Sequence, residues 1–298
     1  MKKYLKTDEW NIIEDSFQAD RMRWSESIFS LGNGRFGQRG HFEEPYSSDS
    51  YRGAFVAGIT FLDKTRVGWW KNGFPQFYTR IPNAPDWSSI SLRLIDEELD
   101  LAQWDVDSFN RRLDMKAGIS YRDAEVTSPR GNKLRLHVEH IANMAHPNLC
   151  VTSVNYTGKV SLVPILDGDT ANPVRHPDEK IWNILRSGTT SDCAYLWTQT
   201  RREDAQICYA MTYRFFKNNK ETFANPIRIE KEKQAGFSVG TEVKPGDTVT
   251  LVKYIAIASS LYYERQDLIE ASVAEARNAQ STGWDALEQE HRNAWQEI

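Results

Sequence analysis

The sequence predicts a mainly β protein in which antiparallel sheets pack face to face, followed by a pair of helices near its end. Between Trp10 and about Leu261, short runs of β-branched and aromatic residues recur and are bounded by Gly, Pro, Asn and Asp. Strands at this density, without intervening helices, favour antiparallel sheets in a sandwich. After about Tyr263 the apolar residues take up helical spacing instead. A chain of 298 residues can hold one large domain of this kind or two ordinary ones.

The strongest strand signals lie in six runs: 55–62, 134–141, 149–156, 160–166, 207–215 and 249–258. Turn-forming residues occur at 129–132 (PRGN) and 244–247 (KPGD), where Pro and Gly favour the dihedral angles of tight turns. The segment 70–90 contains Pro75, Pro82 and Pro85, and we expect it to form a long surface loop.

The glycine-rich stretch ESIFSLGNGRFGQRGHFEE is expected to form two antiparallel strands. Apolar residues alternate on both sides of Gly32-Asn33-Gly34, and an Asn-Gly pair readily accepts the two positive φ angles of a type I′ hairpin turn. The later glycines, Gly37 and Gly40, mark positions where a missing side chain lets another backbone come close.

Three charged residues, Arg39, Glu43 and Glu44, follow on the second of these strands. Arginine presents a donor fork that binds a carboxylate through two bonds, and such pairs often brace a sheet or an interface. The alternative is a pair of catalytic carboxylates. Neighbouring residues on a strand point to opposite faces, so Glu43 and Glu44 are not expected to face one substrate. We therefore favour a structural or interdomain role for Gly32, Asn33, Gly34, Arg39, Gly40, Glu43 and Glu44.

The last part of the chain has the pattern of two helices. In 264–280 the apolar residues lie at helical spacing among charges, and Gly283 then breaks the pattern. A second apolar stripe follows from Trp284 to Ile298, with no stop signal or cap. Such a helix is marginal in water without packing, so we expect a new unit to begin here.

Composition excludes several classes of protein. The chain is 40% hydrophobic and 26% charged, as in soluble globular proteins, and its formal net charge of −4 with no basic run argues against a nucleic-acid partner. Cys150, Cys193 and Cys208 have no ligand spacing, so buried free thiols are expected. No run approaches the ~20 apolar residues of a membrane span, and the first ten residues lack the apolar core of a signal peptide. We expect a cytoplasmic protein.

Candidate chemical groups are few. His137 and His140 are three apart on a predicted strand, face opposite ways and cannot share a metal ion, and no other metal site is expected. The segment 166–169 (LDGD) suggests a turn held by Asx hydrogen bonds, and His176 lies in a predicted loop. The best candidates for contact with a sugar ring are aromatic residues in or beside the proline-bearing loop: Trp69, Trp70 and Trp87. No catalytic motif is present.

An ordered set of motifs nevertheless spans nearly the whole chain. It comprises Glu26 to Gly34, Gly37, Arg39-Gly40, Glu43-Glu44, Tyr51, Ala57-Gly58, Pro82, Pro85-Asp86-Trp87, Arg112 to Met115, Gly118, Arg122, Leu166-Asp167-Gly168, Asn172, His291 and Ala294-Trp295. This set resembles the N-terminal domain of glycoside hydrolase family 65, which contains maltose, trehalose, kojibiose and nigerose phosphorylases and acid trehalases.

The resemblance implies a two-sheet β-supersandwich like that of galactose mutarotase in residues 1–263. It implies a helical linker in residues 264–298, leading to an (α/α)6 catalytic barrel that this chain does not include. In that family the general-acid Glu lies in the barrel, so no catalytic residue can be assigned here. The parent enzyme would attack an α-glucosidic bond with inversion, using inorganic phosphate as co-substrate or water, and no other cofactor is implied. The expected partners are the barrel in cis, a carbohydrate substrate and a possible second copy in a homodimer.

Two other functions stay open. An independent carbohydrate-binding module would need an exposed platform, for which the three tryptophans are the candidates. A mutarotase-like epimerase would need a Glu base and a His acid on one sheet face, such as His137 with Glu125 or Glu139. Fold analogy alone does not confer either activity.

Overall fold

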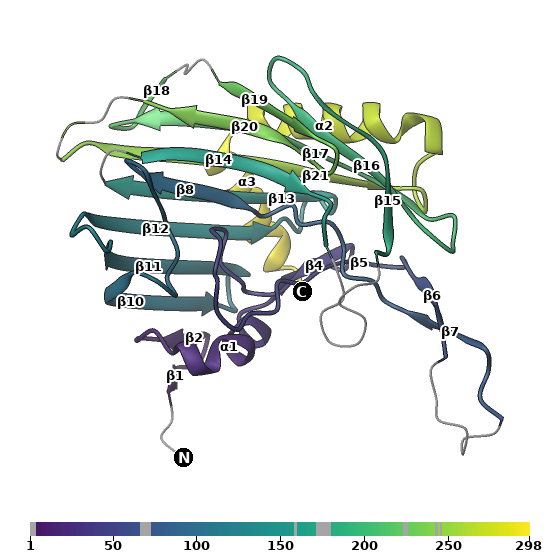
Figure 1. Ribbon diagram of the computed structural model, residues 1–298, viewed down its shortest axis with the longest axis horizontal. Helices are drawn as coiled ribbons and strands as arrows, with labels where there is room; N and C mark the ends of the chain where they lie inside the picture. Colours follow the sequence, from purple (N-terminus) through teal and green to yellow (C-terminus); the bar gives the residue numbers. More distant parts are fainter. Residues whose placement is uncertain are drawn as a thin grey trace.

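The computed structural model describes residues 4–65, 73–157, 160–170, 180–222, 226–241, 244 and 246–298. Trp69, Trp70, Asn172 and His176 lie outside these residues. The predicted fold class is confirmed, because the described chain forms antiparallel sheets followed by two helices (Figure 1).

The largest sheet is the middle layer of the molecule, between the second sheet and the two C-terminal helices. Its strands lie in the order β1 (Leu5–Thr7), β2 (Asn11–Glu14), β10 (Asp105–Asp114), β11 (Ile119–Thr127), β12 (Lys133–Ala142), β13 (Leu149–Thr157), β21 (Thr248–Ser259), β17 (Gln206–Lys217), β16 (Ala194–Thr200) and β15 (Trp182–Thr189), with β18 (Lys220–Glu221) paired to β17. Neighbours pair antiparallel, for example Val138 with Arg122 and Val151 with Tyr254. The predicted runs 134–141, 149–156, 207–215 and 249–258 are all strands of this sheet.

A second sheet packs on one face of the main sheet. Its order is β19 (Ile227–Lys231), β20 (Gln234–Gly240), β14 (Val160–Asp167), β8 (Ile90–Leu94) and β9 (Glu97–Glu98). Alternate residues of β14, such as Leu162 and Leu166, are buried, as expected for a strand with one face in a core. They meet main-sheet side chains such as Tyr209 and Leu251 in one apolar core. Figure 1 shows β8, β14 and β20 on the near side of the main sheet.

Two small sheets and a helix lie beside the sandwich. One small sheet consists of β3 (Leu31–Gly32), β4 (Phe36–Gln38) and β5 (Ala54–Val56), and the other of β6 (Phe61–Lys64) and β7 (Phe77–Arg80). The predicted single strand over 55–62 is wrong: Gly58, with a φ of 74°, separates β5 from β6. Before β3 the chain forms a 3-10 turn, η1 (Ala19–Arg21), and α1 (Met22–Ile28), where sequence alone suggested strands.

The segment predicted as a surface loop is exposed over most of residues 73–81 but buried over most of residues 82–90. β7 occupies part of it, and Pro82, Ala84 and Ser88 are buried. Trp87 is fully buried, stacked on Tyr209 with ring centroids 5.8 Å apart. The surface-loop prediction is therefore wrong for residues 82–90, and so is the setting on which the sugar-contact prediction for Trp87 rested.

The two helices cover the other face of the main sheet. A 3-10 turn, η2 (Arg265–Asp267), leads into α2 (Leu268–Thr282), and Gly283, with a φ of 86°, separates it from α3 (Trp284–Trp295). Ala279 and Leu287 are buried against Ile141 and Val151 of the sheet. Among the described residues, no helix is long and apolar enough to cross a membrane.

Candidate functional site

The hairpin of the glycine-rich stretch turns one residue later than predicted. Of the two residues Asn33 and Gly34, Gly34 alone has a positive φ (85°). The predicted type I′ turn, which needs a positive φ at both residues, is therefore wrong. The Asn33 side-chain oxygen instead accepts hydrogen bonds from the backbone amides of Arg35 (3.0 Å) and Phe36 (3.2 Å). Its amide group donates to the carbonyls of Asn143 (2.8 Å) and Pro147 (3.0 Å). Asn33 thereby fixes the hairpin to the turn between β12 and β13.

Arg39 and Gly40 hold the other end of this hairpin. The Arg39 guanidinium donates to the Tyr51 carbonyl (2.9 Å), the Ser27 hydroxyl (2.7 Å) and the Arg23 carbonyl (2.8 Å). A Cβ at Gly40 would lie 2.7 Å from the Cβ and the carbonyl oxygen of Phe29, so a close approach does require glycine there.

Glu43 and Glu44 converge on one arginine. Arg122 of β11 donates to Glu43 Oε2 at 2.8 Å and to both carboxylate oxygens of Glu44, one of them at 2.6 Å. All three side chains are buried, and Arg122 also lies over the Phe42 ring. Burial alone would raise the pKa of Glu43, but Arg122 and His140 together outweigh burial and lower this pKa to about 2. The group is therefore a pre-formed ion pair and not an acid–base pair poised near neutral pH.

The expectation that Glu43 and Glu44 face opposite ways is wrong. It assumed a strand, but β4 ends at Gln38 and the two residues lie beyond it. The carbonyls of Glu44 (3.0 Å) and Glu43 (3.4 Å) both accept from the Arg52 guanidinium, whereas successive carbonyls of a strand point to opposite sides. This irregular backbone lets both carboxylates reach Arg122.

His140 extends the ion cluster across β12 and β13. Its Nδ1 lies 3.0 Å from the Thr152 hydroxyl and 3.6 Å from Glu43 Oε1, and its Nε2 lies 3.1 Å from the Cys150 sulfur. Burial disfavours the imidazolium, but Cys150 and Glu43 outweigh burial and raise the pKa of His140 to about 10. All three cysteines are free and buried, as predicted.

Two polar groups next to this cluster were missed at the sequence level. Lys253, fully buried on β21, donates to the carbonyls of Trp87 (2.6 Å), Ser89 (3.0 Å) and Ile165 (2.7 Å), and burial lowers its pKa to about 7. The sequence did contain one indication of this buried ammonium group, because Lys253 is the charged residue inside the otherwise mostly apolar run 249–258.

The second missed group surrounds Asp86. Its carboxylate accepts from Arg52 (2.8 Å) and from the Ser88 and Ser89 hydroxyls (both 2.8 Å). Burial would raise the pKa of Asp86, but Arg52, His41 and the two serine hydroxyls together outweigh burial and hold this pKa well below its usual range. His41 Nε2 lies 2.9 Å from the Ser88 hydroxyl oxygen. Burial, aided by Arg52, lowers the pKa of His41 to about 3, so this imidazole is neutral.

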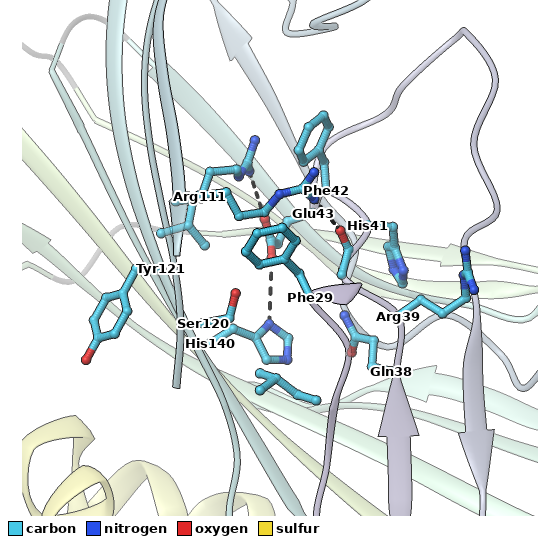
Figure 2. A pocket seen from close by; sticks show the side chains of 14 residues that line it. Phe29, Gln38, Arg39, His41, Phe42, Glu43, Arg111, Ser120, Tyr121 and His140 are labelled. Carbon is cyan, nitrogen blue, oxygen red and sulfur yellow. Dashed lines mark hydrogen bonds and ion pairs between the residues drawn. The ribbon is translucent and has the colours of Figure 1, made fainter. Parts of the chain in front are cut away.

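Two cavities adjoin these groups. The cavity in Figure 2, lined by Gln38, Glu43 and His140 among others, measures about 30 Å³, which is too small for a sugar ring. A surface groove of about 620 Å³ lies on the other side of His41 and Glu43. Its volume suits a small ligand. Two of its charged groups, Arg52 and Asp86, already bind each other.

The residues considered for epimerase chemistry lie elsewhere, on the other face of the main sheet. His137 Nδ1 contacts Asp123 Oδ1 at 2.7 Å and its Nε2 contacts Glu139 Oε1 at 2.9 Å, and Glu125 pairs with Arg135 at 2.5 Å. The Glu139 hydrogen bond, opposed by burial, contributes most to raising the pKa of His137 to about 9. Both ring nitrogens are therefore engaged, and no ring nitrogen is left to serve a substrate.

The full sequence matches the model for "Glycosyl hydrolase family 65, N-terminal domain" over residues 12–298. A maltose phosphorylase of Bacillus subtilis (strain 168) is 29% identical over 99% of this chain and 39% of its own length. An alpha,alpha-trehalose phosphorylase of Thermoanaerobacter brockii is 26% identical over 95% of this chain and 38% of its length. The chain therefore spans about two fifths of these relatives.

A solved structure shares the fold. A putative kojibiose phosphorylase from the human microbiome superposes with a TM-score of 0.87 at 19% identity, over 99% of this chain and 38% of its own. Because the family model covers nearly all of the sequence, the chain belongs to glycosyl hydrolase family 65 and carries the N-terminal domain of that family.

Proposed function

We propose that this chain is the non-catalytic N-terminal supporting domain of an inverting α-glucoside phosphorylase or hydrolase that acts on a glucose disaccharide. One observation carries the proposal: the family's N-terminal model matches residues 12–298, while relatives that align along the whole chain are about two and a half times longer. In this proposal residues 1–263 are the sandwich and residues 264–298 lead to a catalytic barrel in cis.

The chemistry would belong to the barrel. A carboxylic acid there would protonate the glycosidic oxygen while phosphate or water attacks the anomeric carbon from the opposite face. The named relatives are phosphorylases for maltose, trehalose and kojibiose, which favours inorganic phosphate as the nucleophile. The buried, mutually neutralised ions around Arg122 support a structural role for this domain, since Arg122 and His140 hold the pKa of Glu43 far below neutral pH.

The test compares residues 1–298 with the chain extended through the following several hundred residues encoded by its gene. Both receive maltose, trehalose, kojibiose and nigerose, with and without phosphate, and released glucose and glucose 1-phosphate are measured. We expect only the extended chain to act, and phosphate dependence then identifies the subclass. Activity of residues 1–298 alone, or a gene that ends at Ile298, contradicts the proposal.

The groove of about 620 Å³ favours one second candidate, independent carbohydrate binding by this domain. Titrating α-linked glucose disaccharides into residues 1–298 while following NMR shifts tests it. Millimolar binding that moves resonances of Arg52 and Asn83, both in the groove lining, would support binding there. Absence of any shift would reject this candidate.

A further inference from the structure

The outer face of the small sheet β3-β4-β5 is apolar, smooth and uncovered. Phe36 and Val56 point into the core, while Gly37 and its cross-strand partner Phe55 face outward. With Gly34, Gly58 and Ile81 they line a groove of about 380 Å³. The Ile81 side chain is 64% exposed although it is aliphatic. We call these five residues, Gly34, Gly37, Phe55, Gly58 and Ile81, the glycine groove.

Two large exposed side chains, Leu261 and Tyr262, lie at the rim of the glycine groove. Leu261 (49% exposed) lies so close to Gly58 that a Cβ there would be 2.7 Å from its Cδ1. Tyr262 (53% exposed) stacks under the Arg35 guanidinium at 3.4 Å. A contiguous exposed apolar surface of this kind is typical of a protein–protein or interdomain contact.

The glycine groove is fixed to α3 through a shared turn. Asn33, next to Gly34, donates to the Asn143 carbonyl at 2.8 Å, and the Asn143 side chain donates to the Leu287 carbonyl of α3 at 3.2 Å. His291 of α3 accepts from the Met144 amide of the same turn at 3.0 Å. From Leu287 the helix rises about 12 Å to Trp295, whose indole donates to the Met115 carbonyl in the turn between β10 and β11 at 2.9 Å. Chain that follows α3 therefore begins about 12 Å along the helix from Leu287, which contacts the turn that Asn33 binds.

Relatives have more than half of their length outside the matched region, since the matched part is 39% and 38% of two of them. We propose that the glycine groove is the docking surface for the part of the longer protein that follows α3. This inference rests on the proposed function, which supplies that part. The absence of side chains at Gly34 and Gly37 leaves room for an apolar segment to lie directly on the backbone of this sheet.

The test measures the reactivity of single introduced cysteines with a maleimide, read by peptide mass spectrometry. Ile81→Cys reports on the glycine groove, and Ile227→Cys, at a position 71% exposed on β19 of the second sheet, is its matched control. The native Cys150, Cys193 and Cys208 are buried, so background labelling of this domain is slow. Both variants are labelled in residues 1–298 and in the extended chain, at two protein concentrations.

We expect the Ile81→Cys labelling rate to fall at least tenfold in the extended chain, with the Ile227→Cys rate unchanged. A further change, Gly37→Lys, should restore fast labelling at position 81, because a Cβ at Gly37 meets only ordinary contacts (3.5 Å) and its charged side chain would fill the groove. Gly240→Lys, at another strand glycine where a Cβ meets only an ordinary contact (3.9 Å), should not restore it.

Equal rates at position 81 in the two chains would overturn the inference. Protection that appears in residues 1–298 alone and weakens on dilution would also overturn it, because the occupant would then be a second copy. Disaccharide activity of the same extended chain is measured separately. An active chain with an unprotected groove rejects the docking surface only, and a protected groove in an inactive chain rejects the proposed function only.

Discussion

The side-chain amide of Asn33 donates a 2.8 Å hydrogen bond to the backbone carbonyl of Asn143, joining two turns that are 110 residues apart in the sequence. The oxygen of the same Asn33 side chain accepts hydrogen bonds within its own hairpin. One residue therefore stabilises both a local turn and a tertiary contact. This double role explains why the glycine-rich stretch needs an amide here and not merely a turn-forming residue.

Asn33→Asp separates these two roles. The carboxylate keeps the acceptor for the Arg35 and Phe36 amides but loses both donors and faces two carbonyl oxygens. We expect a loss of about 1–3 kcal/mol in the free energy of unfolding, because two carbonyl acceptors, of which that of Asn143 is buried, lose their donor. Urea unfolding measures it, with Asn293→Asp on the exposed side of α3 as the control. A loss equal to that of the control would show that the tie contributes nothing.

Arg122→Met should be among the most destabilising single changes in the domain. It removes the buried cation that binds both Glu43 and Glu44 and leaves His140, 3.6 Å from Glu43, as the neighbouring cation; breaking such a buried pair costs about 3–5 kcal/mol in comparable cases. Arg135→Met, whose pair with Glu125 is largely exposed, should change stability by less than about 1 kcal/mol. The triple variant Arg122→Met, Glu43→Gln, Glu44→Gln should recover much of the loss. No recovery would mean that packing of the guanidinium on Phe42, and not charge, dominates.

The glycines of the stretch should differ in their tolerance of a methyl group. Gly40→Ala would place its Cβ 2.7 Å from Phe29 and should cost about 1–3 kcal/mol through overpacking. Gly37→Ala meets only a 3.5 Å contact and should be nearly neutral. Thermal unfolding of both variants provides the comparison. Equal melting temperatures would contradict the close approach at Gly40.

His41 should make stability depend on pH in mildly acid conditions. Its pKa is about 3 in the folded protein and near 6.5 in the unfolded chain, so between these values the unfolded state binds the extra proton. The free energy of unfolding therefore falls as pH falls from about 6.5 towards 3, by about 1.4 kcal/mol per pH unit from this residue. His41→Gln should lack that slope, which urea unfolding between pH 4.5 and 6 would measure. Parallel curves for the two proteins would refute the assignment.

The long strands could be predicted from sequence because their signals are local. Runs such as 207–215 and 249–258 combine β-branched and aromatic residues with nearby turns, and they form β17 and β21. The run 55–62 has the same composition, but Gly58 gives the chain a positive φ that residue type alone does not require.

The buried polar groups could not be found in the same way. Lys253 and Trp87 are 166 residues apart, and only the packing of the two sheets brings the ammonium to that carbonyl. The sequence suggested that Glu43 and Glu44 pair with an arginine, but it did not identify Arg122. The alternation of side chains along a strand does not apply to these two residues, because β4 ends at Gln38. Trp87 was misplaced for a different reason. The nearby Pro82 and Pro85 suggested a solvent-exposed loop, but the Trp87 ring is buried in the core.

The position of β21 has a consequence for how the chain assembles as it is synthesised. This strand comes last in sequence but lies between β13 and β17 in the main sheet, and it pairs Leu149 with Ala256. Until it emerges from the ribosome, β13 and β17 each present an unpaired edge, and such edges invite pairing with other chains. Pairings this distant in sequence also close slowly. The nascent domain therefore passes through a long interval in which its two half-sheets exist without the strand that joins them, and a chaperone that shields strand edges would act in that interval.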